Sequence, residues 1–143
     1  MENAEKIRVL IADDFKLLCD VIRAYLEREA DMEVVGEAPR LEDALVLATQ
    51  LNPDVILVND YLPPLNSAHA AQVFRESGIT SALLSISMSV EPELIEHSLQ
   101  HGINGFMHKD EIHKLLVTAV RTVHNGERFL SPSARAAYGK DPD

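Results

Sequence analysis

Five short apolar runs alternate with stretches of helical periodicity along this chain of 143 residues. The runs are Ile7–Ala12, Glu33–Glu37, Val55–Val58, Ala82–Ile86 and Ile103–Met107. Several are almost continuously apolar, which is typical of parallel strands buried on both faces. Strands and helices in strict alternation predict an α/β fold. We expect a five-stranded parallel sheet, doubly wound by right-handed crossovers, with helices on both faces.

The segments between the runs carry apolar residues at helical spacing. The expected helices span 17–26, 41–51, 68–74, 93–99 and 112–123. Gly102 is placed to end the fourth helix, because glycine accepts the left-handed conformation that commonly ends helices. Asp110 is placed to cap the start of the fifth. After Gly126 the chain becomes polar and rich in small residues, which predicts at most a short terminal helix.

Polar side chains follow four of the five runs, at the point where each strand should end. They are Asp13, Asp14, Asn59, Ser87 and Lys109. Ligand sites in open parallel sheets lie beyond the carboxyl ends of the strands. We therefore expect these side chains to share one site, although each of them alone reads as an ordinary surface or strand-end residue.

Two adjacent carboxylates such as Asp13 and Asp14 favour a hard cation, and Mg²⁺ prefers carboxylate, water and phosphate oxygens. Ser87 can donate to a phosphoryl oxygen, and Lys109 can pair with a carboxylate or phosphoryl group. Asn59 is the exception in this set. An aspartate carboxylate can attack phosphorus and form an acyl phosphate, whereas a neutral amide cannot.

The chain resembles the receiver domain of two-component response regulators, in particular the NarL/FixJ (LuxR-type) subfamily. The resemblance spans about residues 7–132 and rests on five stretches: Val9–Asp14, Glu33–Ala38, Pro53–Val58 followed by Pro63, Gly102–Asp110, and Gly126–Pro132. It implies the flavodoxin-like strand order 2-1-3-4-5 and a non-enzymatic role in transcriptional signalling. It also implies a receiver over residues 1–126, with residues 127–143 as an extension or the start of a linker to a DNA-binding domain.

The resemblance further implies a role for each site residue. The pair Asp13 and Asp14 would bind Mg²⁺, and position 59 would accept phosphate from a histidine kinase. Ser87 and Lys109 would engage the phosphoryl group, and Phe106 would move with them. Because Asn59 stands at the acceptor position, we expect weak Mg²⁺ binding and no conventional kinase input.

Asp60 directly follows Asn59, but adjacent side chains on a strand point to opposite faces. We therefore do not expect Asp60 to replace the acceptor. Pro64, Asn66 and Ser67 also depart from the family pattern in the loop after the third strand. These departures favour a natural phosphorylation-independent receiver over an engineered Asp→Asn change in an ordinary one. A pseudo-receiver that senses a small molecule is the remaining alternative.

The composition restricts the partners. A formal net charge of −10 disfavours direct nucleic-acid binding by this segment. No apolar run reaches membrane-spanning length and the start lacks a signal-peptide pattern, so we expect a cytoplasmic protein that acts through homodimerisation or a partner protein. The single cysteine, Cys19, suits a reducing compartment and reads as an incidental helix residue. His97 and His101 could share a metal, but without further ligands in sequence they read as a surface pair.

Overall fold

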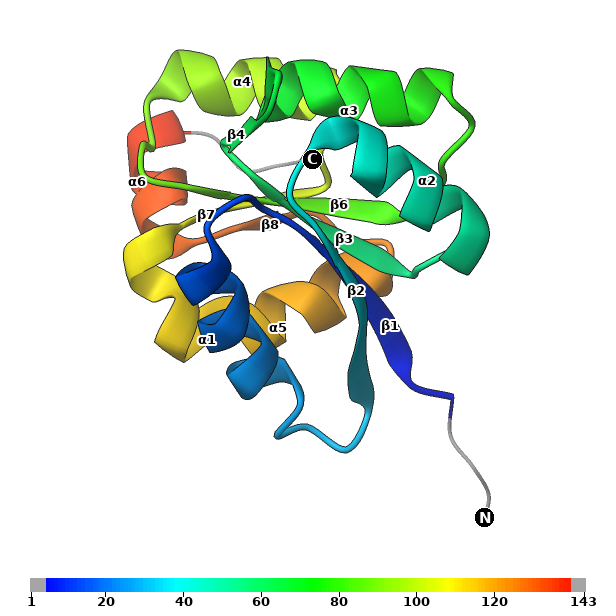
Figure 1. The fold of residues 1–143 in the computed structure, drawn as a ribbon. Helices are drawn as coiled ribbons and strands as arrows, with labels where there is room; N and C mark the ends of the chain where they lie inside the picture. The colour runs from blue at the N-terminus through cyan, green and yellow to red at the C-terminus, as the bar shows by residue number, and fades with distance from the viewer. Residues whose placement is uncertain (1–4, 140–143) are drawn as a thin grey trace.

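The main sheet has six parallel strands in the order β2-β1-β3-β6-β7-β8. The computed structural model describes residues 5–139, and Figure 1 shows the sheet between two layers of helices. The strands are β1 (Ile7–Ala12), β2 (Met32–Ala38), β3 (Val55–Asn59), β6 (Ala82–Ser87), β7 (Gly105–His108) and β8 (Phe129–Leu130). The doubly wound α/β fold and the order of the first five strands are confirmed. The two-residue β8, which pairs with β7, was not expected.

Helices cover both faces of this sheet (Figure 1). One face carries α1 (Lys16–Leu26) and α5 (Ile112–His124), and the other carries α2 (Leu41–Leu51), α3 (Ser67–Glu76) and α4 (Pro92–Gln100). None of the helices described within residues 5–139 is long and apolar enough to span a bilayer.

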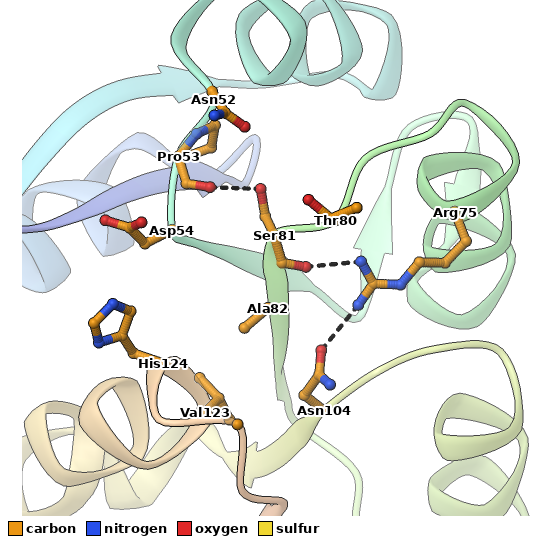
Figure 2. A pocket seen from close by; sticks show the side chains of 11 residues that line it. Asn52, Pro53, Asp54, Arg75, Thr80, Ser81, Ala82, Asn104, Val123 and His124 are labelled. Atoms are coloured by element: carbon orange, nitrogen blue, oxygen red, sulfur yellow. Dashed lines mark hydrogen bonds between the residues drawn. The ribbon is translucent and has the colours of Figure 1, made fainter.

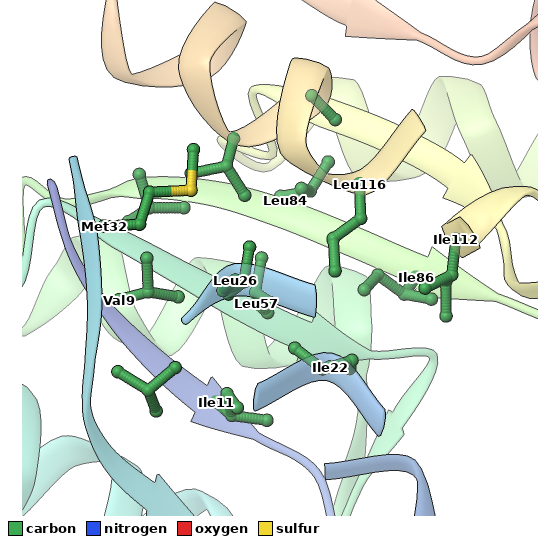
Figure 3. Close-up of a cluster of buried hydrophobic side chains, with 14 of the residues drawn as sticks. Val9, Ile11, Ile22, Leu26, Met32, Leu57, Leu84, Ile86, Ile112 and Leu116 are labelled. Atoms are coloured by element: carbon green, nitrogen blue, oxygen red, sulfur yellow. The ribbon is translucent and has the colours of Figure 1, made fainter. Parts of the chain in front are cut away.

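The core between the sheet and the pair α1 and α5 is built from aliphatic side chains (Figure 3). Ile22 and Leu26 from α1 and Leu116 from α5 are almost fully buried beside Leu57 of β3. Burial of one such side chain stabilises the fold by roughly 1.5–3 kcal/mol. This packing fixes the positions of the strands, and therefore of the residues at their carboxyl ends.

A short antiparallel hairpin follows β3. Its strands are β4 (Tyr61–Leu62) and β5 (Leu65–Asn66), joined by Pro63 and Pro64 with a cis peptide bond between the two prolines. Asn66 then caps α3, since its side-chain oxygen accepts a hydrogen bond from the backbone amide of His69 over 2.9 Å. The unusual residues of this loop therefore build a defined hairpin that leads directly into a capped helix.

The segment after α5 returns to the sheet as β8 and ends in α6 (Pro132–Tyr138), so the expected short terminal helix is present. Leu130 and Ala134 are buried against Ile95 of α4 and Phe106 of β7. The Tyr138 hydroxyl also donates a hydrogen bond of 2.6 Å to Glu96 on α4. The extension is thus part of the folded unit through β8 and α6.

The start and end signals of the helices were predicted with mixed success. Gly102 has a φ of 101° directly after α4, as expected. The cap predicted at Asp110 is wrong, because a short 3₁₀ helix, η1 (Lys109–Glu111), precedes α5. His108 and Glu111 cap η1 instead: the His108 ring accepts the Asp110 amide and the Glu111 carboxylate accepts the His108 amide.

Candidate functional site

Four neighbouring strands bring the predicted site residues to one edge of the sheet. Asp13 follows β1, Asn59 ends β3, Ser87 ends β6 and Lys109 follows β7. Since β1 pairs with β3, β3 with β6 and β6 with β7, the four strand ends lie next to one another. Asp14 and Lys109 both act electrostatically on Asp13, as expected for one shared cluster.

The residue Asp13 is only 5% exposed. Burial raises its pKa, and the negative charges of Asp14 and Asp60 add to that effect. The backbone amide of Phe15, which donates to Asp13 Oδ1 over 2.8 Å, and the positive charge of Lys109 act in the opposite direction. The edge is therefore an electronegative site that gains from a bound cation.

Asn59 is 8% exposed and uses only one end of its amide. Its Nδ2 atom donates to the backbone carbonyl of Tyr61 over 3.1 Å, while its Oδ1 atom is buried without a hydrogen-bond partner. A buried polar atom without a partner is uncommon and indicates a position where a ligand or water completes the bonding.

The residues at this edge supply the oxygen ligands that a hard cation prefers, but they supply fewer carboxylates than a receiver with an aspartate at position 59 would. The side chains of Asp13 and Asp14, with the vacant Oδ1 atom of Asn59, are the oxygen ligands that Mg²⁺ takes. Within residues 5–139, however, no group of three or more His, Cys, Asp or Glu side chains is placed to hold a metal ion. Position 59 supplies an amide here, so the predicted set of ligands has two carboxylates and a neutral oxygen.

Asp60 lies just beyond the end of β3 and reaches across to β6. Its Oδ2 atom accepts hydrogen bonds of 3.2 Å from the Ser87 hydroxyl and of 3.2 Å from the Met88 backbone amide. The expectation that Asp60 points away from the site is wrong, because Asp60 contacts Ser87 and its charge acts on Asp13. Sequence reasoning missed this contact. The only signal was that Asp60 falls after the last strand residue, where alternation no longer applies.

Phe106 is fully buried in β7, beneath α4 and α6. The side chain is enclosed by Ile95, Leu99, Leu130 and Ala134, so it lies away from the acidic edge. Any displacement of Phe106 would therefore first change its packing against α4 and α6.

A second acidic group borders the site on the side of α1 and β2. Burial of Glu37 opposes ionisation, but hydrogen bonds from Lys16 and Arg23 outweigh this effect and lower the pKa of Glu37. Glu37, Asp13 and Asp14 line a hollow of about 180 Å³ next to α1. Lys16 belongs to the same lining, so this hollow is not purely acidic.

A larger hollow of about 450 Å³ lies at the opposite, amino end of the strands (Figure 2). Several of its polar groups are held by hydrogen bonds within the chain. Arg75 donates to the carbonyls of Ile79, Ser81 and Gly102 and to Asn104 Oδ1 over 2.8–2.9 Å, and Ser81 donates to the Pro53 carbonyl over 2.6 Å. We therefore assign this end to structural support of the sheet.

Three histidines lie together where α3 and α4 pack, and the single cysteine is in α1. The ring centroids of His97 on α4 and His101 just after it lie 4.4 Å apart, and the ring centroid of His69 on α3 lies 5.5 Å from that of His97. His69 is a third neighbour that the sequence did not reveal, yet the part of the chain that the structure describes holds no metal-ligating group. Cys19 is buried, and burial raises the pKa of its thiol to about 11, which makes it a poor nucleophile.

Known proteins match both the sequence and the fold. The model of the response regulator receiver domain family matches residues 9–121. The transcriptional regulatory protein MctR of Rhizobium johnstonii is 31% identical over 149 aligned positions, which cover 99% of this chain and 70% of MctR. The nitrate/nitrite response regulator protein NarL of Escherichia coli is 30% identical, with 92% of this chain and 61% of NarL covered.

The structural comparison agrees with the sequence comparison. The signal receiver domain of the putative response regulator NarL from Mycobacterium tuberculosis superimposes with a TM-score of 0.82 at 32% identity. That match covers 87% of this chain and 100% of the receiver domain. The chain spans 61% to 70% of the length of the two curated relatives. The chain therefore belongs to the response regulator receiver family, and its relatives place it with receivers of the NarL type.

Proposed function

We propose that this chain is a regulatory receiver whose state is set by protein contacts and not by phosphorylation at position 59. The observation that carries the proposal is the buried amide of Asn59. Receivers generally bind Mg²⁺ at the acidic pocket of the phosphoacceptor, and the transferred group becomes an acyl phosphate on a carboxylate. The amide of Asn59 supplies no carboxylate, and its nitrogen is engaged by the Tyr61 carbonyl.

Weak Mg²⁺ binding follows from the same residue. A third carboxylate would add a full negative charge to the cluster of Asp13 and Asp14, whereas Asn59 adds only a carbonyl dipole. The raised pKa of Asp13 shows how unfavourable charge already is at this edge. The ion would therefore be held by Asp13, Asp14 and the unpartnered Oδ1 atom of Asn59. It would orient these groups, but position 59 would offer no carboxylate to accept a phosphoryl group.

A surface available for protein contacts lies at the start of α1. Phe15, Leu17 and Val21 are 54%, 64% and 39% exposed, although all three are apolar. Exposed apolar side chains grouped on one helix indicate a contact surface more than scattered ones do. We propose that this end of α1 takes part in self-association or binding of a partner protein.

The transcriptional regulatory protein MctR is longer than this chain, and we propose that this chain forms the regulatory part of such a protein. The formal net charge of −10 argues that DNA contacts would come from another part of the protein.

Intact mass spectrometry tests the phosphorylation-independent state. The native chain and Asn59→Asp are each incubated with MgCl₂ and acetyl phosphate, and Asn59→Ala serves as a control without amide or carboxylate. We expect a phosphoryl adduct on Asn59→Asp alone, which would show that the rest of the site is intact. An adduct on the native chain would overturn the proposal and identify a different acceptor.

A further inference from the structure

The loop between β6 and α4 is connected to Asp60 by a series of hydrogen bonds. The Ser87 hydroxyl donates to Asp60 Oδ2, and Ser87 Oγ in turn accepts the backbone amide of Ser89 over 3.0 Å. The Ser89 hydroxyl oxygen then accepts the backbone amide of Glu91 over 3.4 Å. Glu91 is the N-cap residue of α4. One carboxylate is thus linked, step by step, to the N-cap residue of α4.

Each part of this series is placed where it has few alternatives. Ser87 is fully buried, so its hydroxyl has no access to bulk water and depends on Asp60 as acceptor. The Met88 backbone amide donates to the same Oδ2 atom. Hydrogen bonds to an ionised carboxylate are about twice as strong as neutral ones, and a series of them polarises each member.

Asp60 belongs to the acidic edge of the sheet. It acts repulsively on Asp13, which already lies beside Asp14. A carboxylate in such surroundings is stabilised by donors that converge on it, and the end of β6 provides two. Asn59 next to it adds no charge, which leaves Asp60 as the anion that faces Ser87.

We propose that Asp60 is a built-in anion that holds the β6–α4 loop and the start of α4 in one conformation. The proposal rests on the function proposed above and specifies its regulation. The Ser87 hydroxyl and the Met88 amide, which could otherwise bind an added anionic group, already donate to the carboxylate of Asp60. The α4 surface, including its contact with α6, is therefore held in a state that does not depend on modification of position 59.

Backbone amide exchange, followed residue by residue by NMR without any phosphodonor, tests this proposal. Asp60→Ala removes both hydrogen bonds to the carboxylate, and Asp43→Asn, an exposed change on α2, is the matched control. We expect exchange at Met88 and Ser89 to rise about tenfold or more in Asp60→Ala, with a smaller rise at Glu91. Exchange at Leu57 in the central strand should stay unchanged, which verifies that the variant is folded.

Two further variants locate the effect. Asp60→Asn keeps a neutral acceptor and should give an intermediate rise, and Ser87→Ala should release Ser89 and Glu91 while Met88 stays protected. Exchange rates at Met88 to Glu91 in Asp60→Ala within about twofold of those in Asp43→Asn would overturn the proposal. A phosphoryl adduct on the native chain would instead overturn the proposed function alone, because it does not alter the exchange rates measured without phosphodonor.

Discussion

The side-chain amide of Asn59 donates to the backbone carbonyl of Tyr61 over 3.1 Å. The bond ties the last residue of β3 to the first residue of the hairpin. An aspartate at position 59 would lose this donor and would add a negative charge beside Asp13. The amide is therefore the more stable choice for this edge in the absence of a cation.

Asn59→Asp should lower the melting temperature by roughly 3 °C in a buffer with EDTA, a shift that corresponds to about 1 kcal/mol for a domain of this size. Millimolar MgCl₂ should then raise the melting temperature of Asn59→Asp more than that of the native chain, because the ion stabilises three carboxylates better than two. Differential scanning calorimetry measures both. Equal responses of the two chains to MgCl₂ would argue against a cation at this edge.

Asp13→Asn should stabilise the chain at neutral pH. The pKa of Asp13 is raised in the folded state, so its ionised form costs stability as the pH rises through that pKa. An asparagine keeps an acceptor for the Phe15 amide and removes the charge. We expect a rise of a few degrees in melting temperature at pH 7 and no gain at pH 3. A rise of the same size at both pH values would show that charge is not the cause.

Arg75→Ala should be strongly destabilising, by about 2–4 kcal/mol, because four acceptors lose their donor at once. Arg75→Lys should recover only part of the loss, because an ammonium group cannot reproduce the planar guanidinium contacts. Urea denaturation followed by circular dichroism gives both values. Arg40→Ala, at an exposed arginine in the turn between β2 and α2, should change stability by less than about 0.5 kcal/mol.

The α6 contact can be tested with a pair of alanines. Ala134 is fully buried against α4 and β7, whereas Ala136 is exposed on the same helix. Ala134→Glu should displace α6 and destabilise the chain by about 2–3 kcal/mol, because it places an unpaired charge in an apolar cluster. Ala136→Glu should be nearly neutral. Similar losses of stability in the two variants would mean that the lower helix propensity of glutamate, and not the contact of α6 with α4 and β7, causes the effect.

Arg121 connects α5 to the turn before β2 through Asp31 and Glu29, at 2.8 Å and 2.9 Å. The hydrogen bond from Arg121 lowers the pKa of Asp31, so the stabilisation is complete above the ordinary carboxyl range and is lost as the pH falls through the lowered pKa. The pair is well exposed to solvent, and Arg121→Gln should therefore cost less than about 1 kcal/mol at pH 7. Thermal unfolding of both chains from pH 2 to 7 should show their stabilities converging at the acidic end.

The alternation of apolar runs and helical periodicity predicted the sheet correctly, because burial on both faces leaves a plain pattern in sequence. β8 escaped notice because Phe129 and Leu130 are only two residues, too few for any period to appear. The cap at Asp110 was wrong because a single favourable residue does not reveal the 3₁₀ turn formed by His108 and Glu111.

The candidate site was also predictable only in part. Asp13, Asn59, Ser87 and Lys109 were placed at one edge by strand topology alone, and the structure brings their strand ends together. The contact between Asp60 and Ser87 joins residues 27 positions apart, and it depends on how the chain turns after the last strand residue. No local pattern encodes that turn, so the partner of Asp60 could be found only in three dimensions.

The length of β8 bears on how the sheet meets other molecules. An outer strand exposes unpaired backbone groups that can template pairing with another chain. On this side the outermost strand has two residues, and α6 follows it directly and packs against β7 and α4. The longer outer strand, β2, carries a register irregularity opposite Val9 and Leu10. Continuous β-augmentation is thus disfavoured at both borders, so the helices are the elements through which the proposed protein contacts would form.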